Sequence, residues 1–353
     1  MITIVVLLIL VGISISALTQ TGLFSRAKQA EQKSKEAEQN QTTTLGTYEK
    51  EINKYVAKEL TSDKVDKVLN ATENTVLKDS KGNIFTVPAG FKVTNDATTV
   101  DKGIVVEDAT ETATKGSQFV WVPVGTIIKA DGTTVEIKLD RYTFDEDGNE
   151  TKQDNKIVEN FYQELENSNK GNIAAKSITD FKNSVSINGG YYIGRYEART
   201  TIERTTTEDE LTQISEKKTE YVYNFVTQLQ AANLSQSMYN SNKFTSDLIN
   251  SYAWDTAILF IQNCGKNEKY SRQTRVETSF LSTGTETDVQ CNIFDMASNI
   301  KELTTETSIK PNYPCVFRGG NSYFNNDYTS FRYYNTGVAK GKNVGFRPII
   351  YIE

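Results

Sequence analysis

The sequence contains no histidine, and it has only 3 cysteines and 5 prolines among its 353 residues. Histidine is the commonest general base and the commonest transition-metal ligand in proteins, so its absence excludes the most frequent routes to acid–base and metal chemistry. The cysteines, Cys264, Cys291 and Cys315, do not have the spacing of zinc ligands. In an exported protein two of them could form a disulfide, and the sequence does not say which two.

An excess of basic residues is also missing. The formal net charge is −6 and the calculated pI is about 5.2, so we do not expect nucleic acid as a partner. Asn, Thr, Ser and Tyr are abundant, a composition typical of a β- and loop-rich extracellular surface. The length allows an N-terminal helix and a head of one large or two small domains.

The N-terminal segment is unusual because no charged residue precedes Arg26. Residues 1–18 are an apolar run, and residues 25–38 form a polar stretch rich in Lys, Glu and Ala. The next apolar residues alternate in spacing between three and four, which is the pattern of an amphipathic helix; they are Leu45, Tyr48, Ile52, Tyr55 and Val56. We therefore predict one long helix over residues 1–60, with a partly solvated stalk over residues 25–60.

Three interpretations of the apolar run are open. A secretory signal peptide would need a basic start and a cleavage site. A membrane anchor needs roughly 20 apolar residues, a length that this run barely reaches. The third interpretation is a helix that packs on copies of itself, since Gly12, Ser14 and Ser16 would let helix backbones approach closely. We favour the third, and the residues expected to make these contacts are Ile4, Leu7, Leu8, Val11, Gly12 and Ile15.

This segment resembles the N-terminal helix of type IV pilins and pseudopilins of Clostridium-like Gram-positive bacteria. The resemblance implies a helix that lies in the inner membrane before assembly and then forms a filament core with copies of the same chain. Two features differ from the family: no basic leader precedes the run, and Val5 occupies the position where many pilins have glutamate. Whether a leader has been removed before Met1 is left open.

Strand and turn signals dominate the remainder of the chain. We predict strands over residues 83–87, 103–106 and 118–124. Asp131-Gly132 and Asp147-Gly148 predict two hairpin turns. Amphipathic helices are expected over residues 223–234 and 248–262, and polar residues 156–185 are expected to lie at the surface.

Four motifs in the head resemble the formylglycine-generating-enzyme/sulfatase-modifying-factor domain, a variant of the C-type-lectin fold. They are Phe119–Gly125, Gly190–Glu197, Asn292–Glu302, and Phe317–Gly320 together with Gly345–Pro348. The resemblance implies an α+β fold: a long N-terminal α-helix (1–60), a connection (61–80), and a head of this type (81–353) with a surface insertion at about 126–186.

The chain is not expected to be an enzyme. Oxidase activity in the resembling family needs a cysteine pair just after the Arg-Gly-Gly strand, and residues 321–332 contain no cysteine. Cu(I) is bound by soft thiolate ligands, which hydroxyl and amide groups cannot replace.

The same resemblance implies a calcium site in the Asn292–Glu302 loop. The matching ligands would be the side chains of Asp295 and Glu302 and the carbonyl oxygens of Ser298 and Ile300. Carboxylates and carbonyls suit this hard cation. The alternative is that the two acidic side chains only cap the turn.

Residues 321–342 concentrate aromatic side chains among Asn and Ser, a combination that adaptable binding surfaces use. Ligand-binding candidates in this segment are Tyr323, Phe324, Asn326, Tyr328, Arg332, Tyr333 and Tyr334. Alternatively, these rings belong to the core or contact a neighbouring subunit.

Together, these features predict a structural subunit of a type IV pilus-like extracellular filament with a non-catalytic head, used for adhesion or for binding an unknown surface ligand. The alternative is a single-pass membrane-anchored surface receptor or adhesin with the same head.

Overall fold

The computed structural model describes most of the head and little of the N-terminal segment. The described residues are 28–34, 37, 41, 44, 48, 52–53, 55–153, 158–159, 178–206, 211–212, 214–218, 221–275, 282–284, 288–307, 313, 315–322, 326–336 and 341–353. The chain divides into two compact units, Met1–Glu49 and Lys50–Glu353.

In the first unit the described continuous stretch is helical over residues 28–34, and each of its residues is exposed. The predicted assembly residues Ile4, Leu7, Leu8, Val11, Gly12 and Ile15 lie outside the described residues. Within the described ranges, no helix is both long enough and apolar enough to cross a membrane.

The prediction of an α+β fold with a long N-terminal helix is wrong. Among the described residues, strand residues outnumber helical ones, there is no long N-terminal helix, and the longest helix, α5 (Ser251–Cys264), has 14 residues. Helices in proteins are stabilised mainly by packing of an apolar face; Tyr48, Ile52 and Tyr55 of the expected stripe are helical but exposed, so they do not form the packed face that the spacing predicted.

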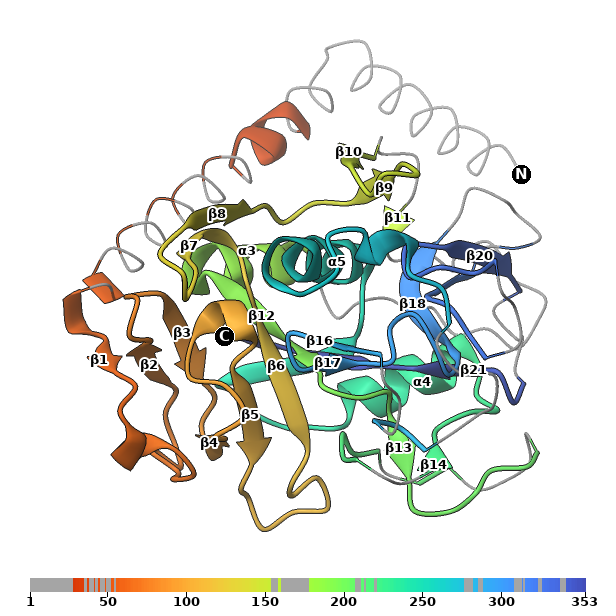
Figure 1. Cartoon of the computed structure of the whole chain (residues 1–353), viewed down its shortest axis with the longest axis horizontal. Helices are drawn as coiled ribbons and strands as arrows, with labels where there is room; N and C mark the ends of the chain where they lie inside the picture. The colour runs from red at the N-terminus through yellow and green to blue at the C-terminus, as the bar shows by residue number, and fades with distance from the viewer. Residues whose placement is uncertain are drawn as a thin grey trace, which may run out of the picture. The chain divides into compact units, whose positions relative to one another are not determined.

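The largest sheet of the head is antiparallel and has six strands (Figure 1). Its order is β15 (Phe244–Leu248), β22 (Pro348–Ile352), β12 (Gly190–Gly194), β6 (Gln118–Pro123), β5 (Val105–Asp108) and β4 (Phe91–Val93). The central strands β12 and β22 are buried along their whole length. Sequence-distant segments therefore meet in this sheet, and its strands supply 17 of the 53 residues of the described hydrophobic core cluster.

Helices α3 (Ile178–Asn188) and α5 pack on one face of this sheet (Figure 1). Phe181 of α3 contacts Tyr191 with 5.4 Å between the ring centroids, and the Tyr191 hydroxyl donates to the Ala253 carbonyl of α5 at 2.5 Å. Because neighbouring strand residues point to opposite faces, Tyr192 points away from these helices. Its hydroxyl donates to the Thr86 carbonyl of β3 (Ile84–Val87) at 2.9 Å.

The second large sheet has five strands. Its order is β11 (Val158–Glu159), β18 (Lys301–Thr307), β19 (Cys315–Arg318) and β20 (Arg332–Asn335), and β21 (Val344–Phe346) pairs with β18 in parallel. Every residue of β18 is buried, although six of the seven are polar or charged. Such a strand needs internal partners for its polar groups, and the ion pairs described below supply several of them.

Smaller elements complete the head. A three-stranded sheet contains β1 (Lys58–Glu59), β2 (Thr75–Lys78) and β3. Four further sheets of the described residues have two strands each: β7 (Gly125–Ile128) with β8 (Thr134–Ile137), β9 (Tyr142–Phe144) with β10 (Glu150–Lys152), β13 (Arg199–Thr200) with β14 (Tyr221–Val222), and β16 (Val289–Gln290) with β17 (Ile293–Phe294). The remaining helices are α4 (Gln228–Gln236) and the short 3-10 helices Ser62–Lys64, Val100–Lys102 and Tyr270–Arg272.

Both predicted hairpin turns are present. Gly132 and Gly148 adopt φ values of +86° and +83° between the paired strands β7–β8 and β9–β10. Both hairpins lie in the segment 126–186 that was expected as a surface insertion. Several residues of that segment nevertheless belong to the hydrophobic core, namely Ile127, Ile137, Tyr142, Phe181 and Val185.

Candidate functional site

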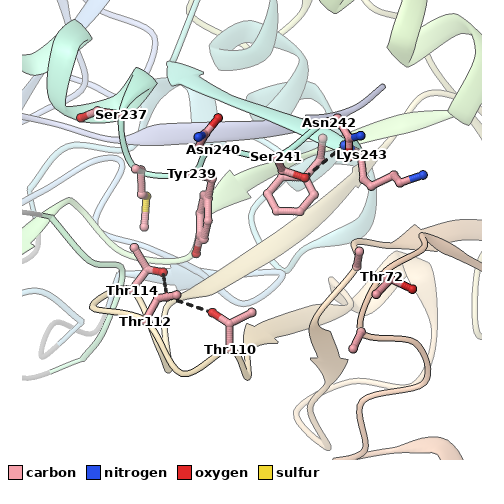
Figure 2. Close-up of a pocket in the computed structure, with 14 residues that line it drawn as sticks. Thr72, Thr110, Thr112, Thr114, Ser237, Tyr239, Asn240, Ser241, Asn242 and Lys243 are labelled. Carbon is pink, nitrogen blue, oxygen red and sulfur yellow. Dashed lines mark hydrogen bonds between the residues drawn. The ribbon is translucent and has the colours of Figure 1, made fainter.

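A pocket of about 860 Å³ opens between two connections of the head (Figure 2). One wall comes from the β5–β6 connection and the other from the α4–β15 connection, and residues near positions 72 and 89 close a third side. The lining residues are Ala71, Thr72, Ala89, Thr110, Thr112, Thr114, Ser237, Met238, Tyr239, Asn240, Ser241, Asn242, Lys243 and Phe244. Its volume lies within the range of about 300–1,000 Å³ that is usual for small-molecule sites.

The threonine wall is organised by the buried carboxylate of Asp108 at the end of β5. Asp108 Oδ1 accepts hydrogen bonds from the backbone N–H and the hydroxyl of Thr110, at 2.8 and 2.5 Å. Asp108 Oδ2 accepts from the hydroxyls of Thr114 at 2.6 Å and Tyr239 at 3.2 Å. The Thr112 hydroxyl lies 2.9 Å from that of Thr110 and 2.8 Å from that of Thr114. The hydroxyls therefore form a connected row (Figure 2).

Tyr239 ties the two walls together. Its ring packs against Phe91, Phe119 and Phe244, with centroid separations of 5.7, 6.2 and 5.4 Å. Burial, followed by the charge of Asp108, raises the pKa of Tyr239 well above its ordinary value. The phenol is therefore neutral at physiological pH, and it donates its proton to Asp108.

The second wall follows directly from helix α4. The helix starts with a capping box, in which the Thr227 hydroxyl accepts from the Gln230 N–H and the Gln230 side chain accepts from the Thr227 N–H. It ends at Gln236, and the chain then makes a short polar connection to β15. In this connection Asn240 and Asn242 are exposed, and their side-chain amides make no hydrogen bond to a described residue. These amides are available to a ligand.

The third side is fixed by backbone and side-chain bonds. Asn74 Nδ2 donates to the Lys243 carbonyl at 2.7 Å, and its Oδ1 accepts from the Ala89 N–H at 3.0 Å. Lys243 Nζ lies 2.7 Å from Glu73 Oε2. Gly90, at φ +81°, passes close to the threonine wall, because an added Cβ would lie 2.8 Å from Thr110 Cγ2. A larger residue at position 90 would displace that wall.

The pocket thus presents neutral hydroxyl and amide groups, and the charged groups beside them, Asp108 and Lys243, already have partners. Asp108 accepts four hydrogen bonds and Lys243 is paired with Glu73. Hydroxyls and amides can both donate and accept. The arrangement is suited to recognition by hydrogen bonding rather than to proton transfer.

The predicted calcium ligands lie in a buried acidic cluster elsewhere in the head. Asp295 has φ +64°, and its Oδ2 accepts from the Gly284 N–H at 2.7 Å. Burial, and the neighbouring charge of Asp288 after it, raises the pKa of Asp295 to about 7. Burial likewise raises the pKa of Glu302 and, together with the charges of Asp295 and Glu302, that of Glu197.

These residues do not fit a calcium ion well. Both oxygens of Glu302 accept from Arg347, with Nη2–Oε1 at 2.6 Å and Nε–Oε2 at 3.0 Å. The Ile300 N–H donates to Glu197 and the Ser298 hydroxyl donates to Asp288. Among the described residues, no three His, Cys, Asp or Glu side chains are grouped to hold a metal ion. A guanidinium bonded to the expected ligand would repel a cation, and the calcium site stays a prediction.

The C-terminal candidates that the structure describes differ in exposure. Tyr323 and Phe324 lie outside the described residues. Asn326 is exposed and Tyr333 is 43% exposed, whereas Tyr328 and Tyr334 are partly buried. The guanidinium carbon of Arg272 lies over the Tyr328 ring, 3.8 Å from the ring centroid.

Arg332 serves a structural role instead of facing solvent. Its Nε lies 2.7 Å from Glu306 Oε1, and its Nη2 lies 2.5 Å from Asp255 Oδ2. Arg318, which is completely buried, bridges the same two acids at 3.1 and 2.5 Å. Burial would raise the pKa of Asp255, but Arg318 and Arg332 hold it below its usual value. This group, Asp255, Glu306, Arg318 and Arg332, is called the paired cluster below.

Sequence reasoning did not identify the pocket. The available signal was the run Ser237–Lys243, which has the same mixture of Tyr, Asn and Ser that drew attention to residues 321–342. The threonines at 110, 112 and 114 alternate in the manner of a strand face, and only the fold brings them beside this run.

No family model matches the chain, and no curated protein matches it. Among solved structures, the Treponema denticola variable protein 1 is 10% identical with a TM-score of 0.37, and the match covers 67% of this chain and 97% of the other.

Two further structures are similarly distant. CarF is 11% identical with a TM-score of 0.32, covering 46% of this chain and 87% of its own. The Major Tropism Determinant I1 variant is 12% identical with a TM-score of 0.30, and the match covers 84% of this chain and 74% of the other. TM-scores this low do not establish a shared fold, and none of these three is named as a pilin or a formylglycine-generating enzyme.

Proposed function

We propose that this chain is the structural subunit of an extracellular pilus-like filament, assembled through its apolar N-terminal residues and carrying a non-catalytic β-rich binding head. The observation that carries the proposal is the absence of charge before Arg26. Exposing the apolar run to water would cost about 1.5–3 kcal/mol for each large side chain. The run therefore needs a lipid or a protein environment.

The polar stretch after the run supports a stalk. Residues 28–34 are helical and exposed, and Glu31 and Lys35 have the i, i+4 spacing that adds roughly 0.2–0.5 kcal/mol to an exposed helix. The head does not need this stretch for its core, because the core cluster of the described residues begins at Leu60 and ends at Ile352.

The chemistry of the thiols supports a non-catalytic head. Burial raises the pKa of Cys264 to about 12 and raises the pKa values of Cys291 and Cys315 as well. A thiol is nucleophilic as the thiolate, so these cysteines are poor nucleophiles at neutral pH. With no histidine in the chain to activate a hydroxyl, binding is the better-supported activity.

Two variants test the proposal: one lacks residues 1–24, and the other is the full-length chain with the substitution Leu8→Lys. Both changes should abolish filaments in negative-stain electron microscopy, and the deleted chain should sediment as a soluble monomer. Gln32→Lys is the matched control, because it adds the same charge to an exposed helical position, and its filaments should persist.

Filaments formed by the deleted chain would contradict the proposal. A full-length chain that fractionates with membranes and never forms filaments would instead favour the single-pass receptor, for which the length of the apolar run is the supporting observation.

A further inference from the structure

We propose that the pocket of Figure 2 binds an uncharged saccharide chain. This inference rests on the proposed binding role of the head and specifies the class of its ligand. The pocket residues used in the argument are Thr110, Thr112, Thr114, Tyr239, Asn240 and Asn242.

An anionic ligand fits the pocket poorly. The lysine of the lining, Lys243, has its ammonium 2.7 Å from Glu73. The buried carboxylate of Asp108 lies behind the threonine row and contacts it through Thr110 and Thr114. An anion would compete with Glu73 for the lysine, although this exposed pair is weak, and it would approach the negative charge of Asp108.

A cationic or metal ligand fits no better. Both oxygens of Asp108 are already occupied by four hydrogen bonds from Thr110, Thr114 and Tyr239. A cation would have to break these bonds and pull the threonine wall apart. Apart from Lys243, which is paired with Glu73, the side chains that line the pocket are neutral.

A purely apolar ligand would leave those groups without partners. Covering a donor or acceptor without replacing its hydrogen bond to water is unfavourable. The amides of Asn240 and Asn242 are exposed and make no hydrogen bond to described residues, so an apolar occupant would bury them unpaired. The ligand must therefore carry many neutral donors and acceptors.

A saccharide meets this requirement. Each of its hydroxyls can donate and accept, and so can the exposed Thr112 hydroxyl and the two amides, whereas the Thr110 hydroxyl, which donates to Asp108, can only accept from a ligand. The apolar atoms of Ala71, Ala89 and Phe244 in the lining offer contacts for the C–H faces of sugar rings. Since the pocket holds about 860 Å³, it can take several sugar units.

The experiment compares full-length chains in detergent solution. The double variant Asn240→Ala/Asn242→Ala removes the two free amides while leaving the Asp108 network intact. The control is Asn326→Ala, an equally exposed asparagine of the C-terminal segment. Binding is measured by calorimetry with two neutral probes, a glucose tetramer and an N-acetylglucosamine tetramer, and with a sulfated tetramer as a charged probe.

We expect at least one neutral tetramer to bind, and the double variant to bind it about tenfold or more weakly, as the loss of two hydrogen bonds implies. The control should bind as well as the native chain. The two neutral probes distinguish a hexose polymer from an amino-sugar polymer as the source. Circular dichroism of the double variant should match that of the native chain.

Three results would overturn the inference: no binding of either neutral tetramer, binding of the sulfated tetramer alone, or equal affinity in the native chain and the double variant. Filament formation is scored separately for each chain. Normal filaments without saccharide binding would contradict this inference and leave the assembly proposal intact. Saccharide binding without filaments would support this inference and contradict the assembly proposal.

Discussion

The pocket and the C-terminal segment 326–336 have similar compositions but use their polar groups differently. In the segment, Arg332 forms ion pairs with Asp255 and Glu306, and the Tyr328 ring contacts the guanidinium of Arg272. In the pocket, Asp108 fixes the wall from behind, and the amides of Asn240 and Asn242 remain available. The comparison teaches that composition marks where binding groups are concentrated, whereas the existing partners of those groups decide whether they can bind.

The largest expected effect comes from breaking the paired cluster in the segment. Arg332→Ala should lower the free energy of unfolding by about 3–5 kcal/mol, because it leaves buried carboxylates with fewer partners. Urea unfolding followed by tryptophan fluorescence measures it, since Trp254 lies beside Arg318, with 5.6 Å between the guanidinium carbon and the ring. If Arg332→Ala altered saccharide binding while stability stayed unchanged, the segment would be a binding surface after all.

A second prediction contrasts Asp255 of the paired cluster with Asp295 of the acidic cluster. Burial raises the pKa of Asp295 to about 7, whereas an unfolded chain has an Asp pKa of about 3.9. The folded state therefore binds more protons between these values, so this residue's contribution to stability is complete below about pH 4 and is lost as the pH rises to about 7.

Asp295→Asn should flatten that part of the pH dependence, because an amide stays neutral and its oxygen can still accept from the Gly284 N–H. Urea midpoints of both chains across this pH range provide the measurement. An unchanged slope in the variant would show that Asp295 is ionised throughout, as Asp255 is, and would reopen the calcium prediction. In that case, millimolar calcium should raise the melting temperature of the native chain.

The smallest expected effect is that of Tyr333→Ser. The Tyr333 ring is 43% exposed and has Lys301 Nζ at 4.1 Å from its centroid. A cation–π contact contributes about 0.5–1 kcal/mol at exposed sites and about 2 kcal/mol when it is desolvated. Because Lys301 is buried and the ring is not, the loss in unfolding free energy should stay below about 2 kcal/mol, and saccharide affinity should be unchanged. A tenfold loss of affinity would place the ligand on this segment.

Local signals in the sequence predicted the local elements. Asp131-Gly132 and Asp147-Gly148 gave the hairpins because their glycines can adopt the positive φ that these turns need. Helix α5 was predicted over 248–262, and it begins at Ser251 because the Asn250 side chain accepts from the Ala253 N–H.

The overall fold class and the candidate site could not be predicted in the same way. Asp255, Glu306, Arg318 and Arg332 meet from four separate elements, and the pocket joins residues near positions 72, 110 and 240. No pattern within a short stretch of sequence predicts these long-range contacts. The amphipathic stripe at 45–56 predicted a packed helical face from its spacing alone, but its members Tyr48, Ile52 and Tyr55 are helical and exposed rather than packed.

Hydrogen–deuterium exchange of the full-length chain, with and without the neutral tetrasaccharide that binds best, tests most directly whether the pocket is the binding site. Bound ligand should slow exchange of the backbone amides in residues 108–116 and 237–244, which form the two walls. Residues 326–336 should exchange at the same rate in both samples. Protection confined to residues 326–336, or no protection of either wall at saturating ligand, would contradict the assignment of the pocket.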